Sequence, residues 1–332
     1  MQRGSVMPKI GEKIIYLSRA EVESLNIDIP DILSALESMF REKAEGRVEM
    51  PPKPAIHTRE NAFLHAMPAF IPGIKSAGVK WVGGYPDNFR LNLPYITGLL
   101  ILNDVDTGIP YAVMDCSWIT AVRTAAATAV TAKYLANKGS KTLAILGCGV
   151  QGRYNLEALS PLFGFAEVRV YDVDEEVSRR YREEMSRRCP VEIRVAQGPE
   201  AAVRDADIVV TAGPFLMEPD PVIEFSWIKP GALLCPLDLD SYFKPEVFLR
   251  SDFLCTDDLG QYRHFKKSGL FGALPEDLEE LAQVVSGKFD GRKSPSDVIS
   301  AINIGIALED MSVAPLVYEK ACEKGAGVWL DL

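Results

Sequence analysis

The sequence has few residues of the kinds that bind metals or form disulfide frameworks. Its 332 residues include only three histidines, and its six cysteines are widely spaced and never form a CxxC pair. It has no HExxH motif and no carboxylate cluster at metal-ligand spacing. The pattern therefore predicts no metal site, and it indicates reduced thiols rather than a disulfide framework.

Positive charge and long apolar runs are also scarce. The chain has 36 Lys and Arg residues against 46 Asp and Glu residues, which gives a formal net charge of −10. Nucleic acids and anionic membranes select basic surfaces, so this balance argues against both partners. No apolar run approaches the roughly 18 residues that a membrane span needs, and the mixed polar start does not resemble a signal peptide. We therefore expect a cytoplasmic protein.

The first 140 residues show no regular alternation of strands and helices. An amphipathic helix is predicted over residues 29 to 45, where apolar side chains recur at helical spacing. Residues 100 to 115 have the pattern of a hairpin with a glycine-containing loop. This region is therefore predicted to be α+β and mostly antiparallel. Further strand-like runs cover residues 62 to 69, 77 to 83 and 97 to 102.

From residue 141 onward, strands and helices alternate, which predicts an α/β fold with a doubly wound parallel sheet. A chain of this length typically forms about two domains. An Ala- and Thr-rich helix over residues 117 to 135 would lead from the first region into the second. A last helix is expected over residues 302 to 324, where Pro315 should kink it or split it.

A glycine motif lies where a strand-like run turns into a helix-like segment. The hexapeptide Gly147-Cys148-Gly149-Val150-Gln151-Gly152 follows the apolar residues 142 to 146. In such a motif the first glycine allows a tight turn, and the second lets a pyrophosphate approach the backbone. The third lets helix and strand pack closely. The alternative is that the glycines only form a tight turn in an α/β core.

A second element supports dinucleotide binding. The next strand-like run, residues 167 to 171, ends in Asp172, twenty residues past Gly152. A carboxylate there accepts the ribose hydroxyls of NAD and repels the 2′-phosphate of NADP. Arg179 and Arg180 lie farther along the following helix, where they leave this preference open. Asp172 could otherwise be the N-cap of a helix over residues 174 to 186.

The segment Asp115-Cys116-Ser117-Trp118-Ile119-Thr120-Ala121-Val122-Arg123-Thr124-Ala125-Ala126-Ala127, shortly before the glycine motif, resembles the signature of the ornithine cyclodeaminase and mu-crystallin family. Similar segments at residues 65 to 69, 78 to 80, 93 to 98 and 304 to 310 extend the resemblance over nearly the whole chain. The resemblance implies a Rossmann NAD-binding domain over residues 118 to 301. It also implies a substrate-binding and dimerisation domain formed by residues 1 to 117 with 302 to 332. Strands from two chains would close into a barrel, which makes a homodimer.

The resemblance also implies which cations hold the substrate. Arg123 matches an arginine that binds the substrate carboxylate, and a guanidinium fork suits that role. Lys80, in the strand-like residues 79 to 82, matches a substrate-contacting lysine, and we also expect it to be a catalytic residue. An inward lysine would need an anion or a shifted pKa. The alternatives are an exposed Arg123 and a Lys80 that alternation directs to water.

Asp240 matches the family's catalytic aspartate. It is expected to close a strand-like segment over residues 231 to 240, at the carboxyl end where ligands gather in parallel sheets. Its implied role is to accept a proton from the substrate's α-ammonium group. Asp238 would share the same strand face, so the role could belong to either residue. A purely structural turn role for both is the remaining alternative.

Four further positions match contacts to the dinucleotide in relatives, and three other positions depart from the family pattern. Lys53 stands where relatives often carry an arginine that completes the carboxylate clamp; a lysine offers a point charge but no fork. His65 stands where cyclodeaminases acting on ornithine carry a glutamate, so a pocket-facing His65 would favour a small, neutral or anionic side chain. The alternative for His65 is a hydrogen-bonded role elsewhere in the first domain. Gly213 replaces a common threonine, and its small size would let the cofactor lie flat. The matching cofactor positions are Thr97, Val150, Gln151 and Asp172.

These features together predict an NAD-dependent oxidoreductase that interconverts a small L-amino acid and its imino or 2-oxo acid, or reduces a cyclic ketimine. The nicotinamide would carry hydride, while Asp240 moves protons. The first alternative is an ornithine cyclodeaminase-type ammonia lyase, in which the hydride returns after ring closure. A glutamate-free position 65 argues against ornithine in that reaction. The second alternative is a non-catalytic binding protein, and the retained Asp240 argues against it.

Overall fold

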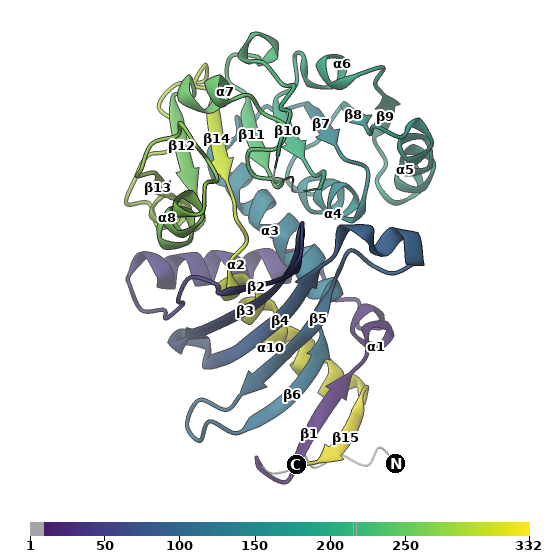
Figure 1. The fold of residues 1–332 in the computed structure, drawn as a ribbon, viewed down its shortest axis with the longest axis vertical. Helices are drawn as coiled ribbons and strands as arrows, with labels where there is room; N and C mark the ends of the chain where they lie inside the picture. Colours follow the sequence, from purple (N-terminus) through teal and green to yellow (C-terminus); the bar gives the residue numbers. More distant parts are fainter. Residues whose placement is uncertain (1–9, 215, 217) are drawn as a thin grey trace. The chain divides into compact units, whose positions relative to one another are not determined.

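The computed structural model describes residues 10–214, 216 and 218–332 of the chain (Figure 1). The chain forms two compact units. The first runs up to Arg123 and resumes at Ala307–Leu332, and the second is Thr124–Ile306. The chain ends therefore belong to one unit, and the middle of the chain forms the other.

The first unit is built on a mixed sheet of seven strands within the described residues. Its long central strands pair antiparallel, whereas β1 lies parallel to β6 and antiparallel to the last strand, β15. The predicted α+β, mostly antiparallel character is confirmed. The order is β15 (Val328–Asp331), β1 (Lys13–Leu17), β6 (Pro110–Asp115), β5 (Ile96–Asn103), β4 (Ser76–Gly84), β3 (Ala62–Ile71) and β2 (Ala55–Arg59).

Helix α10 (Ala307–Lys324) packs against this sheet, and α2 (Ile29–Ala44) packs against α10. The predicted amphipathic helix is confirmed as α2, which buries Ile32, Leu36 and Phe40 completely. It contacts α10, which in turn contacts β3 and β4. The apolar stripe of α2 therefore completes the core of this unit. The short helices of the unit are α1 (Arg19–Ser24), η1 (Pro72–Ile74) and η2 (Pro86–Leu91).

Helix α10 begins later than expected and is not split by Pro315. Ile302 ends a buried strand, β14 (Ile299–Ile302), so the expectation of a helix from residue 302 was wrong. Pro315 lacks the N–H that would bond to the carbonyl of Met311 one turn earlier. The Ser76 hydroxyl donates to that carbonyl at 2.7 Å instead. A side chain from β4 thus satisfies the acceptor, and the helix continues to Lys324.

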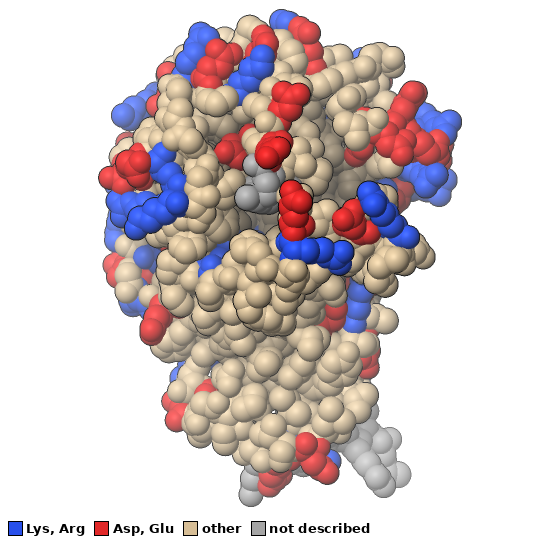
Figure 2. Space-filling view, in the orientation of Figure 1, with Lys and Arg blue, Asp and Glu red and all other residues tan. Residues whose placement is uncertain are grey.

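The other face of the same sheet is apolar and open in this chain. Trp81 and Leu99 lie opposite each other on β4 and β5, and each is 43% exposed. Tyr16 and Val328 form a second exposed cross-strand pair on β1 and β15. Figure 2 shows few charged side chains over the strands of this unit. A water-facing sheet surface normally alternates to polar residues, so this face has the composition of an interface.

The second unit is built on a parallel sheet of eight strands within the described residues. The first five positions have the classic Rossmann order, so the predicted doubly wound α/β fold is confirmed. The order is β9 (Glu192–Val195), β8 (Glu167–Tyr171), β7 (Thr142–Leu146), β10 (Ile208–Thr211), β11 (Leu233–Pro236), β14, β12 (Phe253–Thr256) and β13 (Glu279–Glu280).

The predicted helix over residues 117 to 135 is confirmed as α3 (Ser117–Leu135), which carries the chain from the first unit into the second. None of the helices in the described part of the chain is long and apolar enough to cross a membrane. The remaining helices of the second unit are α4 (Val150–Leu159), α5 (Glu175–Arg188), α6 (Pro199–Val203), η3 (Phe225–Trp227), α7 (Pro245–Leu249), α8 (Leu259–Lys267) and α9 (Leu281–Val285).

The packing of α2 predicts a large cost for shortening its central aromatic side chain. Phe40→Ala should lower the free energy of unfolding by about 3–5 kcal/mol, because a fully buried ring leaves a cavity. Ser38→Ala, on the exposed side of the same helix, should change it by less than about 0.5 kcal/mol. Urea unfolding followed by circular dichroism measures both. Equal costs for the two variants would contradict the assigned face of α2.

Candidate functional site

The three motif glycines have three different surroundings. Gly147 has φ +99°, and a Cβ there would lie 2.5 Å from the Ala212 carbonyl at the end of β10. A Cβ at Gly152 would overlap the carbonyl oxygen of Gly147, so this glycine lets α4 pack on its own strand. A Cβ at Gly149 would meet no described atom within 4 Å. Two glycines are therefore required by packing, and the middle one faces open space.

That open space lies at the N-terminus of α4. Gly149 is the N-cap residue of α4, and no described side chain caps this end. The first amides of a helix point at such a space and carry partial positive charge, which suits an anion. The residues therefore fit the pyrophosphate of a dinucleotide. Val150, the first residue of the helix, is 59% exposed beside it.

Asp172 lies beside the glycine loop. It follows the last residue of β8, and its Oδ2 accepts a hydrogen bond of 2.8 Å from Cys148 N–H. Its Oδ1 accepts from Asp174 N–H at 3.2 Å. The side chain that caps α5 belongs to Asp174, which accepts from Glu176 N–H. The alternative that Asp172 is the helix cap was therefore wrong, and its carboxylate is joined to the glycine loop instead.

Asp238 and Asp240 do not share a strand face. Strand β11 ends at Pro236, and Leu239 between the two acids has φ +63°, so the expected strand over residues 231 to 240 was wrong. At this turn the Asp238 side chain contacts the end of the neighbouring strand. Its Oδ1 accepts from the Thr211 hydroxyl at 2.7 Å and its Oδ2 from Gly213 N–H at 3.0 Å, so it joins the ends of β10 and β11.

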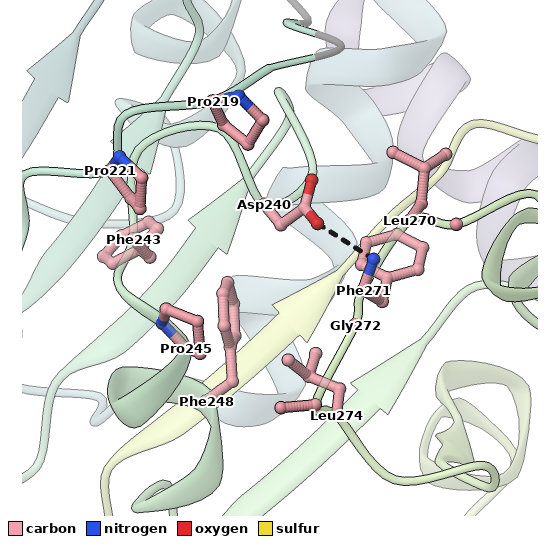
Figure 3. Close-up of a pocket in the computed structure, with 12 residues that line it drawn as sticks. Pro219, Pro221, Asp240, Phe243, Pro245, Phe248, Leu270, Phe271, Gly272 and Leu274 are labelled. Carbon is pink, nitrogen blue, oxygen red and sulfur yellow. Dashed lines mark hydrogen bonds between the residues drawn. The ribbon is translucent and has the colours of Figure 1, made fainter.

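Asp240 faces a pocket of about 330 Å³ (Figure 3). Its Oδ2 accepts from Phe271 N–H at 2.9 Å, while its Oδ1 is buried and has no hydrogen-bond partner among the described residues. The walls are mostly apolar, with Phe243 and Phe248 from one side and Leu270 to Leu274 from the other. The carboxylate oxygen Oδ1 of Asp240 therefore has acceptor capacity that no described group uses.

Lys80 and Arg123 are both buried in the first unit, where both contact Asp310. Lys80 is fully buried, and its Nζ lies 2.7 Å from Asp310 Oδ1. Arg123 is 5% exposed, with Nη1 at 2.6 Å from Glu309 Oε2 and Nε at 3.2 Å from Asp310 Oδ1. The alternatives of an exposed Arg123 and a water-facing Lys80 were therefore wrong. Burial lowers the pKa of Lys80, and the neighbouring guanidinium lowers it further.

The anions of this cluster come from the protein itself. Glu309 and Asp310 stand at the start of α10, and both are fully buried. Sequence reasoning missed them as partners, although they end the family-like segment of residues 304 to 310. The burial of Lys80 was expected to imply a ligand, but Asp310 already supplies an anion. Burial alone is therefore no sign of substrate binding at Lys80.

Two of the three positions that depart from the family pattern, Lys53 and His65, also lie in the first unit. Lys53 is 8% exposed, so its ammonium group is not simply solvated. His65 is half-buried on β3 and stacks on Phe63, with ring centroids 4.2 Å apart. His65 pairs with Val82, and Met67 pairs with Lys80, which places His65 on the same sheet face as Lys80. The remaining cofactor candidates are Thr97, exposed on β5, and Gln151 in the first turn of α4.

No group of three or more His, Cys, Asp or Glu side chains in the described ranges is arranged to hold a metal ion. The six cysteines are unpaired in the structure, and five of them are buried. Burial raises the pKa of the Cys148 thiol in the glycine loop to about 12, so it is held as a neutral thiol. The candidate reactive groups are therefore carboxylates and cations.

Comparison with known proteins places the chain in a family. Residues 12–325 match the model of the ornithine cyclodeaminase/mu-crystallin family, so the chain belongs to that family, as the sequence resemblance predicted. It is 36% identical to the nodulation efficiency protein NfeD of Rhizobium meliloti, over 94% of this chain and 97% of the relative.

Two solved structures share the fold throughout. The first is an archaeal alanine dehydrogenase dimer with bound NAD, at 34% identity and a TM-score of 0.87, over 96% of this chain and 99% of that one. The second is the Δ1-pyrroline-2-carboxylate reductase of Thermococcus litoralis in complex with NADH and L-proline. It is 31% identical with a TM-score of 0.86, over 95% of this chain and 99% of that one.

The surroundings of Asp238 predict a pH-dependent stability. Burial raises the pKa of Asp238 from 3.8 to about 7, although Thr211 and Gly213 favour the charged form and Asp240 disfavours it. The folded state therefore retains a proton that the unfolded chain releases, and stability falls as pH rises through about 7. Each pKa unit corresponds to about 1.4 kcal/mol.

The comparison that tests this is Asp238→Asn, which keeps the shape but does not titrate. Between about pH 5 and pH 8, wild type should lose free energy of unfolding relative to the variant, by urea unfolding at each pH. Parallel stability curves for the two proteins would contradict a raised pKa at Asp238.

Proposed function

We propose that this chain is an NAD-dependent oxidoreductase that interconverts a small L-amino acid and its imino or 2-oxo acid. The observation that carries the proposal is the glycine loop. Gly147 and Gly152 are required by packing, Gly149 borders open space at a helix N-terminus, and Asp172 is joined to the same loop. This combination has the roles that dinucleotide binding assigns to each residue. The named relatives that are dehydrogenases or reductases support it.

The residues proposed to hold the cofactor come from several elements. The α4 amides would face the pyrophosphate, and Asp172 would accept ribose hydroxyls and so favour NAD over NADP. When bound, NAD exchanges a hydride with the α-carbon of the substrate. Besides Gly147, Gly149 and Gly152, the proposed contacts are Thr97, Val150, Gln151, Asp172 and Gly213.

The chain's own side chains would bind the substrate and move its protons. Arg123 offers a guanidinium fork to the carboxylate, with Lys80 and Lys53 as further cations. Asp240 would accept the proton of the α-ammonium group at Oδ1, while Phe271 N–H holds Oδ2. His65 on the Lys80 face carries no permanent negative charge, which favours a small neutral or acidic side chain over ornithine. Lys80 is proposed to take part in the reaction as well as in binding.

We also propose a homodimer formed through the open face of the first unit's sheet. The exposed pairs Trp81 with Leu99 and Tyr16 with Val328 would be buried by a second copy. An apolar surface of this kind is costly in water. The alanine dehydrogenase described above is a dimer, which agrees with this assembly. Each copy would contribute the same strands to the interface.

The glycine loop gives a direct test of the cofactor site. Gly149→Ala should keep the free energy of unfolding within about 1 kcal/mol, because its φ of −78° suits alanine and no described atom is near. It should nevertheless weaken NADH binding at least ~10-fold, since the methyl group enters the proposed pyrophosphate space. Gly152→Ala should instead lower stability by about 1–3 kcal/mol through overlap with the Gly147 carbonyl.

NADH fluorescence titration and urea unfolding separate these two effects. The matched control is Gly139→Ala, a loop glycine with no described atom near its Cβ position. Unchanged NADH affinity in Gly149→Ala would contradict the assignment of this loop to the cofactor.

The reaction itself is tested by supplying NAD with alanine, aspartate, ornithine or lysine in turn. A small amino acid should give its 2-oxo acid and ammonia with equimolar NADH, measured by absorbance and mass spectrometry. Asp240→Asn should reduce this rate at least ~100-fold and leave NADH affinity unchanged, because it removes the proton acceptor. Asp277→Asn, an exposed acid of the same unit, is the control.

The cyclodeaminase alternative gives a different result in the same assay. Conversion of ornithine to proline without net NADH would replace the oxidoreductase proposal with that alternative. The absence of any turnover or NADH binding would contradict both.

A further inference from the structure

Tyr242 occupies the space beside Gly213, a residue already assigned to the cofactor site. A Cβ at Gly213 would lie 2.5 Å from the Tyr242 Cζ and even closer to its hydroxyl oxygen. The backbone that carries the ring is held in place, because the Tyr242 carbonyl accepts hydrogen bonds from Val222 N–H at 3.0 Å and Ile223 N–H at 2.9 Å. The phenol therefore lies over the backbone at the end of β10.

That piece of backbone adjoins the glycine loop. The Ala212 carbonyl lies 2.5 Å from the Cβ position of Gly147, and the Gly213 nitrogen lies 2.7 Å from it. Gly213 N–H is held by Asp238, which lies four residues before Tyr242 in the turn after β11. The adjacent strands β7, β10 and β11 thus bring the loop, Gly213 and Tyr242 together at their carboxyl ends. Ligands of doubly wound sheets bind along this edge.

The chemical state of the phenol suits a hydrogen-bond donor. Burial raises the pKa of Tyr242 to about 12, and the carboxylates of Asp238 and Asp172 contribute to the increase. The hydroxyl is therefore neutral and keeps its proton near neutral pH. Both carboxylates already accept protein N–H or O–H groups.

We propose that Tyr242 is a cofactor-binding residue whose hydroxyl donates a hydrogen bond to the ribose–phosphate part of bound NAD, and that position 213 is a glycine because this ring fills the space of a side chain there. The inference rests on the proposed NAD site and adds a residue to it. Asp238 serves as a positioning residue, since it holds the Gly213 backbone beneath the ring.

The first test is Tyr242→Phe in the full-length chain, with NADH affinity measured by fluorescence titration. Loss of one hydrogen bond should raise the Kd for NADH roughly 3- to 10-fold. Urea unfolding without cofactor should stay close to wild type, because the ring remains. Tyr262→Phe is the matched control: it loses a hydroxyl bonded to the Pro275 carbonyl in the same unit and should keep the wild-type Kd.

The second test removes the space. Gly213→Ala should displace the ring and weaken NADH binding at least as much, and adding Tyr242→Phe in that background should cause less than a twofold further change. Such non-additivity is expected for residues in contact. A wild-type Kd in Tyr242→Phe would overturn the proposal. Fully additive effects of the two substitutions on the Kd would overturn the claim that the ring fills the side-chain space at position 213. If the wild-type chain did not bind NADH, the proposed cofactor site itself would be wrong. Normal NADH binding by the wild type together with an unchanged Kd in Tyr242→Phe would instead contradict only the role of Tyr242.

Discussion

The buried ion cluster of the first unit constrains the rest of that unit. Lys80, Arg123, Glu309 and Asp310 contribute two positive and two negative charges, all of them nearly or fully inaccessible to water. Each buried ion costs several kcal/mol of desolvation, and removing one partner typically costs about 3–5 kcal/mol. The four groups therefore have to be kept together. Their contacts fix α10 against β4, which carries Lys80, and against the first turns of α3, which carry Arg123.

This constraint would also prepare the cations for the substrate carboxylate proposed above. Arg123 is held at Nη1 and Nε by two different carboxylates, so its orientation is set before any substrate arrives. A side chain that is already ordered loses little further entropy on binding. The cost is that the cluster is formally neutral, so an incoming carboxylate must share the cations with Glu309 and Asp310. A guanidinium with five donors can do so, whereas Lys80 has three.

The sequence predicts those parts of the structure that depend on local pattern. Helix α2 was predicted because its apolar spacing alone defines the buried face, and the glycine loop because strand, turn and helix follow each other directly. The partners of Lys80 could not be predicted in this way, since Asp310 lies 230 residues away and only the fold brings it to β4. Strands β1 and β15 could not be predicted for a similar reason. They come from opposite ends of the chain, and each is completed by pairing with the other.

The expected split of the last helix at Pro315 and the expected strand up to residue 240 were both wrong. Pro315 leaves the Met311 carbonyl without its helical donor, and the Ser76 hydroxyl replaces that donor. The alternation that placed Asp238 and Asp240 on one strand face ended at Pro236, where Leu239 adopts a left-handed conformation. Neither feature can be predicted from the local sequence. Ser76 lies on another element, and the left-handed conformation of Leu239 is a property of the folded backbone.

The three acids at the carboxyl edge of the parallel sheet differ in what their oxygens have left to accept. Both oxygens of Asp172 accept backbone N–H groups, and both oxygens of Asp238 accept donors from the end of β10. Asp240 lines the pocket; only its Oδ2 is engaged, and its buried Oδ1 has no partner in the described part of the chain. A buried acceptor without a donor is unfavourable unless a ligand supplies one. The hydrogen-bond inventory therefore favours Asp240 over Asp238 as the proton acceptor, independently of the family resemblance.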